Sequence, residues 1–225
     1  MSDYVIETRG LTKQYGAQTS VSDLSIHVRQ GRIYGLLGRN GAGKTTTMRM
    51  LLGLTDPSSG TVSLFGKPLR GNEKKILPRI GSLIESPGFY PNLTGTENLR
   101  IFADLRGLKS PKYIKSALEV VNLPYRDKKL FSQYSLGMKQ KLGLAQAIME
   151  GQDILVLDEP FNALDYKTYN DVKEIIRTLH AEGKTILMTS HNYEDIETLC
   201  DEIYAIEDGQ LGTPPADEMK RRFRG

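Results

Sequence analysis

A glycine-rich stretch, GRNGAGKT from Gly38 to Thr45, has the composition of a phosphate-binding loop. It matches G-x-x-x-x-G-K-[ST] at every fixed position and lies between an apolar run and a helical pattern. Its glycines let backbone N–H groups surround phosphate oxygens, Lys44 would reach the β and γ phosphates, and the Thr45 hydroxyl would face Mg²⁺. The predicted ATP-binding residues are Gly38, Arg39, Asn40, Gly41, Ala42, Gly43, Lys44, Thr45 and Thr46.

Two carboxylates end a second apolar run, in ILVLDEP, and a histidine ends a third, in MTSH. Ligands of open α/β sheets gather where parallel strands end. We therefore expect Asp158 to hold Mg²⁺ through water, as a metal-site partner of Thr45, and Glu159 to polarise an attacking water. His191 could reach the γ-phosphate or hold that water, although a surface histidine that ends a strand is the better explanation when His191 is taken alone.

A second candidate anion site lies at YSLGMKQ, residues 134–140. Ser135 is of the type that caps a helix, and the exposed N–H groups of a helix start with Ser135 and Gly137 would attract an anion. Tyr15 could stack on an adenine ring, although most of the 11 tyrosines must serve in packing or at the surface. Asp165, in NALD, is first a candidate helix N-cap.

The elements that must position these residues alternate between strand and helix at both ends of the chain. Periodicity predicts strands at 4–8, 24–28, 32–38, 61–66, 81–84, 153–160 and 184–191, helices at 43–52, 166–183 and 192–200, and a closing hairpin at 202–212. From Pro91 to Glu150 the pattern is helical, with a capping box at Thr94–Glu97 and a helix start at Ser110-Pro111. We expect an α/β P-loop NTPase core with an antiparallel β subdomain and an inserted helical lobe at about 91–150.

The composition fits one α/β domain. The 225 residues include 30 basic and 27 acidic side chains, and a net charge of +3 does not by itself indicate nucleic acid. A single cysteine, Cys200, excludes an internal disulfide and fits a reducing compartment. No apolar run approaches the ~20 residues of a membrane span, and the N-terminus does not have the pattern of a signal peptide. We expect a cytoplasmic protein with at most a peripheral role at a membrane.

In their order along the chain, these features resemble the nucleotide-binding subunit of ATP-binding cassette (ABC) transporters. The P-loop with LVLDEP is specific for an NTPase, and YSLGMKQ some twenty residues before LVLDEP makes the resemblance specific for this family. The resemblance covers about residues 4–213, a single nucleotide-binding domain, and leaves 214–225 as a short basic tail. It implies an ATPase that uses ATP and Mg²⁺ and drives a separate integral membrane permease from the inner face of a bacterial membrane, with no nucleic acid partner.

The resemblance also gives the second anion site a partner. It implies that two subunits pack head to tail, as a homodimer in the ATP-bound state, with each ATP between one P-loop and the other subunit's Ser135 and Gly137. It places Asp165 at the same interface. It makes His191 the residue that senses the γ-phosphate and Tyr15 the adenine stacker.

The chain departs from the family pattern at several positions. The usual signature reads Leu-Ser-Gly-Gly-Gln, whereas Leu136 and Met138 replace a glycine and the glutamine here, and Phe161 stands where threonine is common. Glu85 stands where the family usually carries a glutamine that contacts Mg²⁺. A carboxylate only accepts hydrogen bonds, and it adds a negative charge beside the metal.

A glutamate at position 85, followed by SPGFYPNLT and by YSLGMKQ further downstream, resembles the pattern of the bacterial exporters that protect cells against bacitracin and lantibiotics. The alternative interpretation is that Glu85 is a loop carboxylate with no role in the site. A second function class is a soluble ABC-type ATPase not coupled to transport, as in iron–sulfur cluster assembly. A GTPase lacks support because the chain has no Asn-Lys-x-Asp motif. Co-purification with a membrane protein would separate the transporter from the soluble ATPase.

Overall fold

The computed structural model describes residues 4–85, 88–212 and 216–223. A six-stranded sheet forms its centre, in the order β11-β10-β4-β9-β8-β7, and all neighbours are parallel except β10 and β11. Its strands are β4 (Ile33–Leu37), β7 (Ile80–Leu83), β8 (Ile154–Leu157), β9 (Thr185–Ser190), β10 (Glu202–Glu207) and β11 (Gln210–Gly212). Every residue of β4, β8 and β9 is buried, as expected for parallel strands covered on both faces.

A second sheet is antiparallel, as the sequence predicted. It contains β1 (Tyr4–Tyr15), β2 (Gln18–Leu24), β3 (His27–Arg29), β5 (Ser59–Leu64) and β6 (Lys67–Pro68). The single strand expected at 24–28 is wrong, because the chain leaves β2 at Leu24 and enters β3 at His27. At this break the buried Thr8 hydroxyl donates to Leu24 O at 3.0 Å and accepts from Ile26 N at 2.9 Å.

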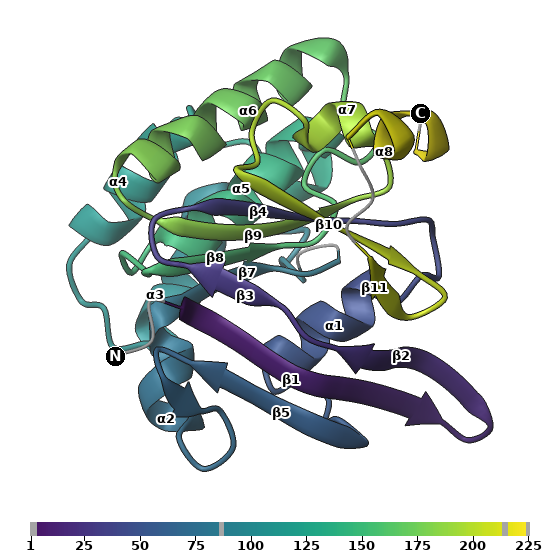
Figure 1. The fold of residues 1–225 in the computed structure, drawn as a ribbon. Coiled ribbons are helices and arrows are strands. Elements are labelled where there is room, and N and C mark those ends of the chain that lie inside the picture. The colour runs from purple at the N-terminus through teal and green to yellow at the C-terminus, as the bar shows by residue number, and fades with distance from the viewer. Residues whose placement is uncertain (1–3, 86–87, 213–215, 224–225) are drawn as a thin grey trace.

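Helices fill the space between the sheets and cover the other face of the central sheet (Figure 1). They are α1 (Lys44–Leu51), α2 (Glu73–Ile76), α3 (Gly95–Leu105), α4 (Lys112–Val120), α5 (Leu136–Ile148), α6 (Tyr166–Ala181), α7 (Tyr193–Ile196) and α8 (Ala216–Arg222). Short 3₁₀ turns occupy Leu77–Arg79 and Phe131–Gln133. No helix in the described part of the chain combines the length and the apolar character that crossing a bilayer requires.

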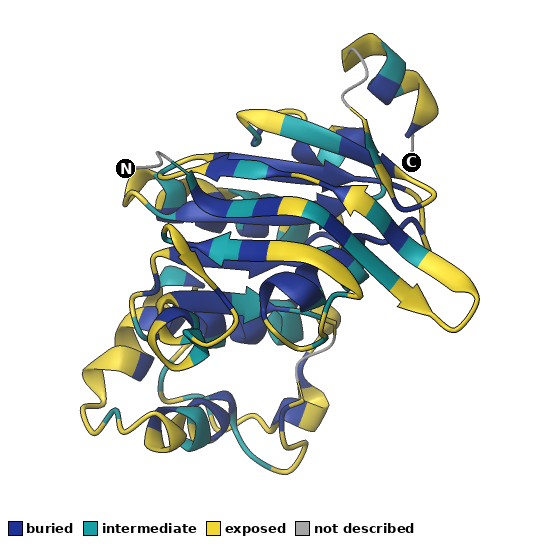
Figure 2. Ribbon diagram, turned by 60° about the horizontal axis from the view of Figure 1, so that its bottom comes forward, coloured by how far each residue is buried: buried dark blue, intermediate teal, exposed yellow. Residues whose placement is uncertain are grey.

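Two hydrophobic cores lie on opposite faces of the central sheet. On β4, Ile33 and Leu37 face the core shared with α5 and α6, whereas Tyr34 and Leu36 face the core shared with α1 and the antiparallel sheet. This alternation is the two-residue period of a strand. Figure 2 shows the central strands as buried and the tip of the β1–β2 hairpin as exposed. The central strands are therefore packed on both faces, which fixes the positions of the residues at their ends.

The helical lobe spans α3, α4 and α5, and residues 91–150 contain no strand. The predicted capping box is confirmed, because Thr94 Oγ1 accepts from Glu97 N while Glu97 Oε2 accepts from Thr94 N. At the other end of the chain, α8 packs against α7 and buries Met219 and Phe223. Tyr193 N donates to Phe223 O at 2.9 Å. The boundary expected between 213 and 214 lies outside the described residues.

Candidate nucleotide-binding site

The glycine-rich loop connects the end of β4 to the first turn of α1. Gly43 has a φ of 104°, which L side chains rarely adopt, and a Cβ there would lie 2.5 Å from Ser20 O. A Cβ on Gly38 would lie 2.5 Å from Ile206 O. Both glycines are therefore required by the close approach of the loop to its neighbours. The Arg39 and Asn40 side chains are exposed, whereas Ala42 is buried.

Lys44 is buried in this loop, with 5% of its surface exposed. Its Nζ donates to Gly38 O at 2.6 Å and to Arg39 O at 3.2 Å. It also lies 3.0 Å from Glu159 Oε1. The Lys44 ammonium group thus lies at the carboxyl ends of the parallel strands β4 and β8.

Asp158 follows β8 and forms two short hydrogen bonds. It accepts from Thr45 Oγ1 and from Thr189 Oγ1, each at 2.7 Å. Thr189 also accepts from Glu159 N at 2.8 Å. The sequence analysis did not identify Thr189, although it lies two positions before His191 on the adjacent strand. This buried hydroxyl fixes both carboxylate residues of the ILVLDEP segment.

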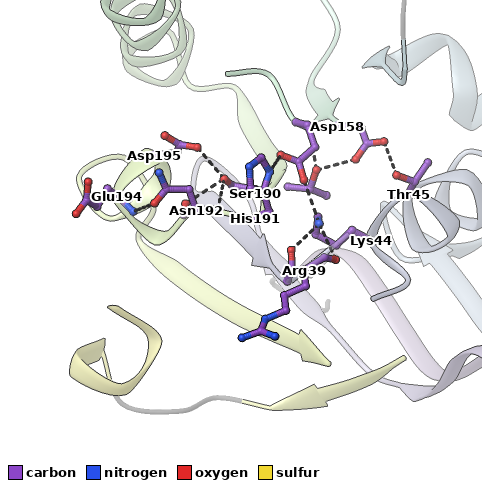
Figure 3. A network of polar contacts seen from close by, with 12 residues as sticks. Arg39, Lys44, Thr45, Asp158, Ser190, His191, Asn192, Glu194 and Asp195 are labelled. Carbon is purple, nitrogen blue, oxygen red and sulfur yellow. Dashed lines mark hydrogen bonds and ion pairs between the residues drawn. The ribbon is translucent and has the colours of Figure 1, made fainter. Parts of the chain in front are cut away.

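Glu159 and His191 face each other across the ends of β8 and β9. His191 Nδ1 lies 2.9 Å from Glu159 Oε2, and Glu159 has a φ of 47°, in the left-handed region. The other oxygen, Oε1, is buried without a hydrogen-bond partner among the described residues, and forms an ion pair with Lys44. These contacts bring together the predicted residues Lys44, Thr45, Asp158, Glu159 and His191. Figure 3 shows Lys44, Thr45, Asp158 and His191 close to one another.

These residues fit ATP with Mg²⁺. The Thr45 hydroxyl and the Asp158 carboxylate are hard oxygen donors 2.7 Å apart. Glu159 Oε1, buried without a hydrogen-bond partner among the described residues, forms an ion pair with Lys44 of the same loop. In the described ranges there is no group of three or more His, Cys, Asp or Glu that could hold a metal ion. Mg²⁺ is commonly held by one or two carboxylates, waters and substrate phosphates, so this donor set suits it.

The second anion site lies at the start of α5. Ser135 is the N-cap, and its Oγ accepts from Met138 N at 3.2 Å. Asp165 is the predicted N-cap of α6 and accepts from Thr168 N and Thr168 Oγ1. A Cβ on Gly137 would lie 2.4 Å from Thr168 Cγ2, so Thr168 brings Gly137 and Asp165 together. Among the described residues, no hydrogen bond or ion pair joins these groups to the P-loop.

Two further predicted residues, Tyr15 and Glu85, neighbour elements that contact the P-loop or α1. Tyr15 is half exposed at the end of β1, and it is paired with β2, whose Ser20 Oγ lies 3.0 Å from Thr46 Oγ1. Glu85 is exposed, has a φ of 59°, and forms an ion pair and hydrogen bond with Arg49 of α1. No contact in the described structure joins Glu85 to the pair of Asp158 and Thr45.

The loop after Glu85 is described only in part, because residues 86 and 87 lie outside the described residues. Phe89 is buried against Phe102 and Phe131, with ring centroids 5.6 and 5.2 Å apart. Tyr90 is 54% exposed. Phe89 therefore belongs to the core of the helical lobe, and Tyr90 remains available at the surface.

Comparison with known proteins places this geometry among transport ATPases. A family model described as "ABC transporter" matches residues 21–162. The bacitracin transport ATP-binding protein BcrA of Enterococcus faecalis is 50% identical over 93% of this chain and 68% of its own length. The protein of the same name from Bacillus licheniformis is 48% identical over 98% of this chain and 72% of its own.

Solved structures agree with this family. A structure titled as the ATP binding subunit of an ABC transporter superposes with a TM-score of 0.82 at 30% identity, and covers 97% of this chain and 93% of that chain. The cbiO1 protein of Clostridium perfringens, whose title describes it as part of an ABC transporter complex, superposes with a TM-score of 0.83 at 21% identity. The second similarity concerns the fold alone.

Proposed function

The chain belongs to the ABC transporter family of ATP-binding subunits, which are ATPases coupled to transport, and we propose that its transporter confers resistance to bacitracin-type peptide antibiotics. The proposal is supported by the 50% and 48% identity to two bacitracin transport ATP-binding proteins over nearly the whole chain. The observation that carries the ATPase role is the convergence of Lys44, Thr45, Asp158 and Glu159 at one edge of the central sheet.

Phosphate binding falls to the P-loop and Lys44. The glycine backbone presents N–H groups at the start of α1, and the helix dipole adds to their attraction for an anion. Thr45 and Asp158 would hold Mg²⁺, which supplies charge neutralisation at the phosphate oxygens. Thr189 keeps Asp158 in place by donating to its second oxygen, Oδ1, at 2.7 Å.

Hydrolysis needs a base that faces the attacking water, and Glu159 has the position for it. In the structure Glu159 is engaged by both Lys44 and His191. Phosphate oxygens carry more negative charge than one carboxylate, so a bound γ-phosphate would compete for both groups. Glu159 would then be released to accept a proton from water, with His191 beside it to orient the reacting groups.

A complete site requires a second subunit in this proposal. Ser135 is exposed at the start of α5 and, within the described residues, does not contact its own P-loop. Each ATP would lie between one P-loop and the partner subunit's α5 start, with Asp165 nearby. Glu159→Gln with ATP and Mg²⁺ should therefore form a homodimer, and adding Ser135→Arg should prevent it. Equal dimerisation of both proteins in light scattering would refute the head-to-tail arrangement.

We propose that the chain works beside an integral membrane permease at the inner face of the bacterial membrane. The test expresses the chain in a bacitracin-sensitive host together with a membrane permease that co-purifies with it. Wild type should raise tolerance to bacitracin but not to an unrelated antibiotic, and Glu159→Gln should abolish the gain at equal expression. Equal tolerance with and without the wild-type pair would contradict the resistance role and leave the ATPase role standing.

A further inference from the structure

Asp195 is a carboxylate that the proposed mechanism does not use, and it contacts the residue that precedes His191. Asp195, on α7, is half-buried, and its Oδ2 lies 3.0 Å from Ser190 Oγ (Figure 3). Ser190 immediately precedes His191 and is 1% exposed. We propose that Asp195 is a positioning residue that sets His191 against Glu159 by fixing the hydroxyl of Ser190. The inference rests on the role proposed above for His191.

Ser190 controls the turn on which His191 lies. Its carbonyl accepts from Gly38 N at 3.0 Å, which joins the end of β9 to the first glycine of the P-loop. Its Oγ accepts from Asn192 N at 3.0 Å. Ser190 thus forms a hydrogen bond with the residue that follows His191, and this bond closes the turn that contains His191. The hydroxyl has one proton to donate, and both Asn192 O and Asp195 Oδ2 lie 3.0 Å away. A carboxylate is the stronger acceptor, so Asp195 gives the hydroxyl one direction.

Asp195 is itself held from α6. Its carboxylate forms a hydrogen bond with the Tyr169 side chain. Burial and the charge of Asp195 raise the pKa of Tyr169 to about 12, so the phenol remains protonated and can donate. Lys173 Nζ lies 3.4 Å from Tyr169 Oη, and the Tyr169 ring packs 5.2 Å from that of Phe161, which follows Glu159 by two positions. These contacts connect the strand end that carries His191 with the segment that follows Glu159.

The charge of Asp195 has an energetic cost. Burial raises its pKa, the hydrogen bonds from Ser190 and Tyr169 and the charge of His191 oppose the rise, and the charge of Glu159 adds to it. The net shift is upward, so the folded protein disfavours the ionised form. Glu194 differs from Asp195, because it is exposed and its backbone N–H donates to Asn192 Oδ1. A carboxylate retained at such a cost is typical of a functional position.

The test measures ATP hydrolysis by Asp195→Ala in two backgrounds, wild type and His191→Ala. We expect kcat to fall ~10-fold in the wild-type background, less than the 10²-fold that a misplacement of about 1 Å can cost. The KM for ATP should change less than ~2-fold, because the P-loop residues are unchanged and the Ser190 carbonyl, not its hydroxyl, contacts Gly38. In the His191→Ala background the same substitution should cost less than ~2-fold, because the residue it positions is already absent.

Two control variants and a single-turnover assay keep this test decisive. Asp195→Asn preserves the shape and one acceptor oxygen for Ser190, so it should fold and lose less kcat than Asp195→Ala. Glu194→Ala removes an adjacent carboxylate and should hydrolyse ATP at the wild-type rate. Single-turnover assays with enzyme in excess over ATP keep slow variants measurable.

The outcomes separate this inference from the proposed function. An equal fold-loss for Asp195→Ala in both backgrounds would overturn the positioning role and leave the ATPase assignment intact. Wild-type turnover by both Asp195 variants would overturn it as well. Wild-type turnover by His191→Ala would remove His191 from the proposed mechanism, and the inference about Asp195 would fail with it.

Discussion

Replacing Thr189 by valine should damage both stability and turnover. Valine has nearly the shape of threonine but removes a buried hydroxyl that donates to Asp158 Oδ1 and accepts from Glu159 N. The first bond has a charged acceptor and contributes about 1.5–3 kcal/mol, and the second about 0.5–1.5 kcal/mol. The free energy of unfolding should therefore fall by about 3 kcal/mol, which lowers Tm by ~6–12 °C for a chain of this size.

Turnover should fall because the same hydroxyl positions both carboxylate residues. Without it, Asp158 loses one of its two hydroxyl partners and the backbone at Glu159 loses its fixed donor direction. A misplacement of this kind should lower kcat ~10- to 10²-fold. The assay is steady-state ATP hydrolysis at a temperature where thermal unfolding shows both proteins fully folded.

Thr185→Val is the matched control, because Thr185 is a buried threonine at the other end of β9. Its Oγ1 accepts from Gly31 N at 2.9 Å, far along the strand from His191. Its loss should cost about 1 kcal/mol of stability and leave kcat unchanged. Wild-type kcat in Thr189→Val, or an equal loss in both variants, would refute the argument that Thr189 organises the site.

Three further predictions concern single residues. Lys44→Ala removes a charge-assisted phosphate contact of about 1.5–3 kcal/mol, so calorimetry should show ~10- to 10²-fold weaker ATP binding; unchanged affinity would exclude the loop as the phosphate site. Glu85→Ala should lower the bacitracin tolerance of cells more than the ATPase of the purified subunit, and Glu85→Gln should be milder; unchanged values in both assays would make Glu85 a plain loop carboxylate. Because burial raises the pKa of Asp195, wild type should lose unfolding free energy as pH rises from ~4 through the folded pKa, whereas Asp195→Asn should not. The Tm of Asp195→Asn minus that of wild type should therefore grow between pH 4 and pH 8, and a constant difference would contradict the shift.

Local chemistry made much of the site predictable. The P-loop needs glycine, lysine and a hydroxyl at fixed spacing, and the N-caps Thr94, Ser135 and Asp165 act within three residues of their own position. Such short-range patterns can be identified from sequence because the partners are close along the chain. The expected order of strands and helices follows from the same periodicity.

Side chains that act across elements were not predictable in this way. Thr189 contacts Asp158 from a neighbouring strand, 31 positions away, and a threonine in a buried strand otherwise indicates only strand propensity. Thr8 bonds to Leu24 and Ile26 where β2 ends, and no pattern within 24–28 encodes that break. Asp195 is one of two acidic residues in a short helix, and only the fold brings it into contact with Ser190, next to His191. Strand order and burial decide these contacts.

In the proposed mechanism, Glu159 acts as the base for ATP hydrolysis in a site built by the P-loop and Asp158. The most direct test of this role compares wild type with Glu159→Gln for ATP affinity and for steady-state release of phosphate, with Glu194→Gln as an exposed carboxylate control. We expect Glu159→Gln to bind ATP at least as well as wild type and to lose ~10²- to 10⁴-fold in turnover, while the control matches wild type. Turnover by Glu159→Gln within a factor of ~2 of wild type would exclude Glu159 as the base.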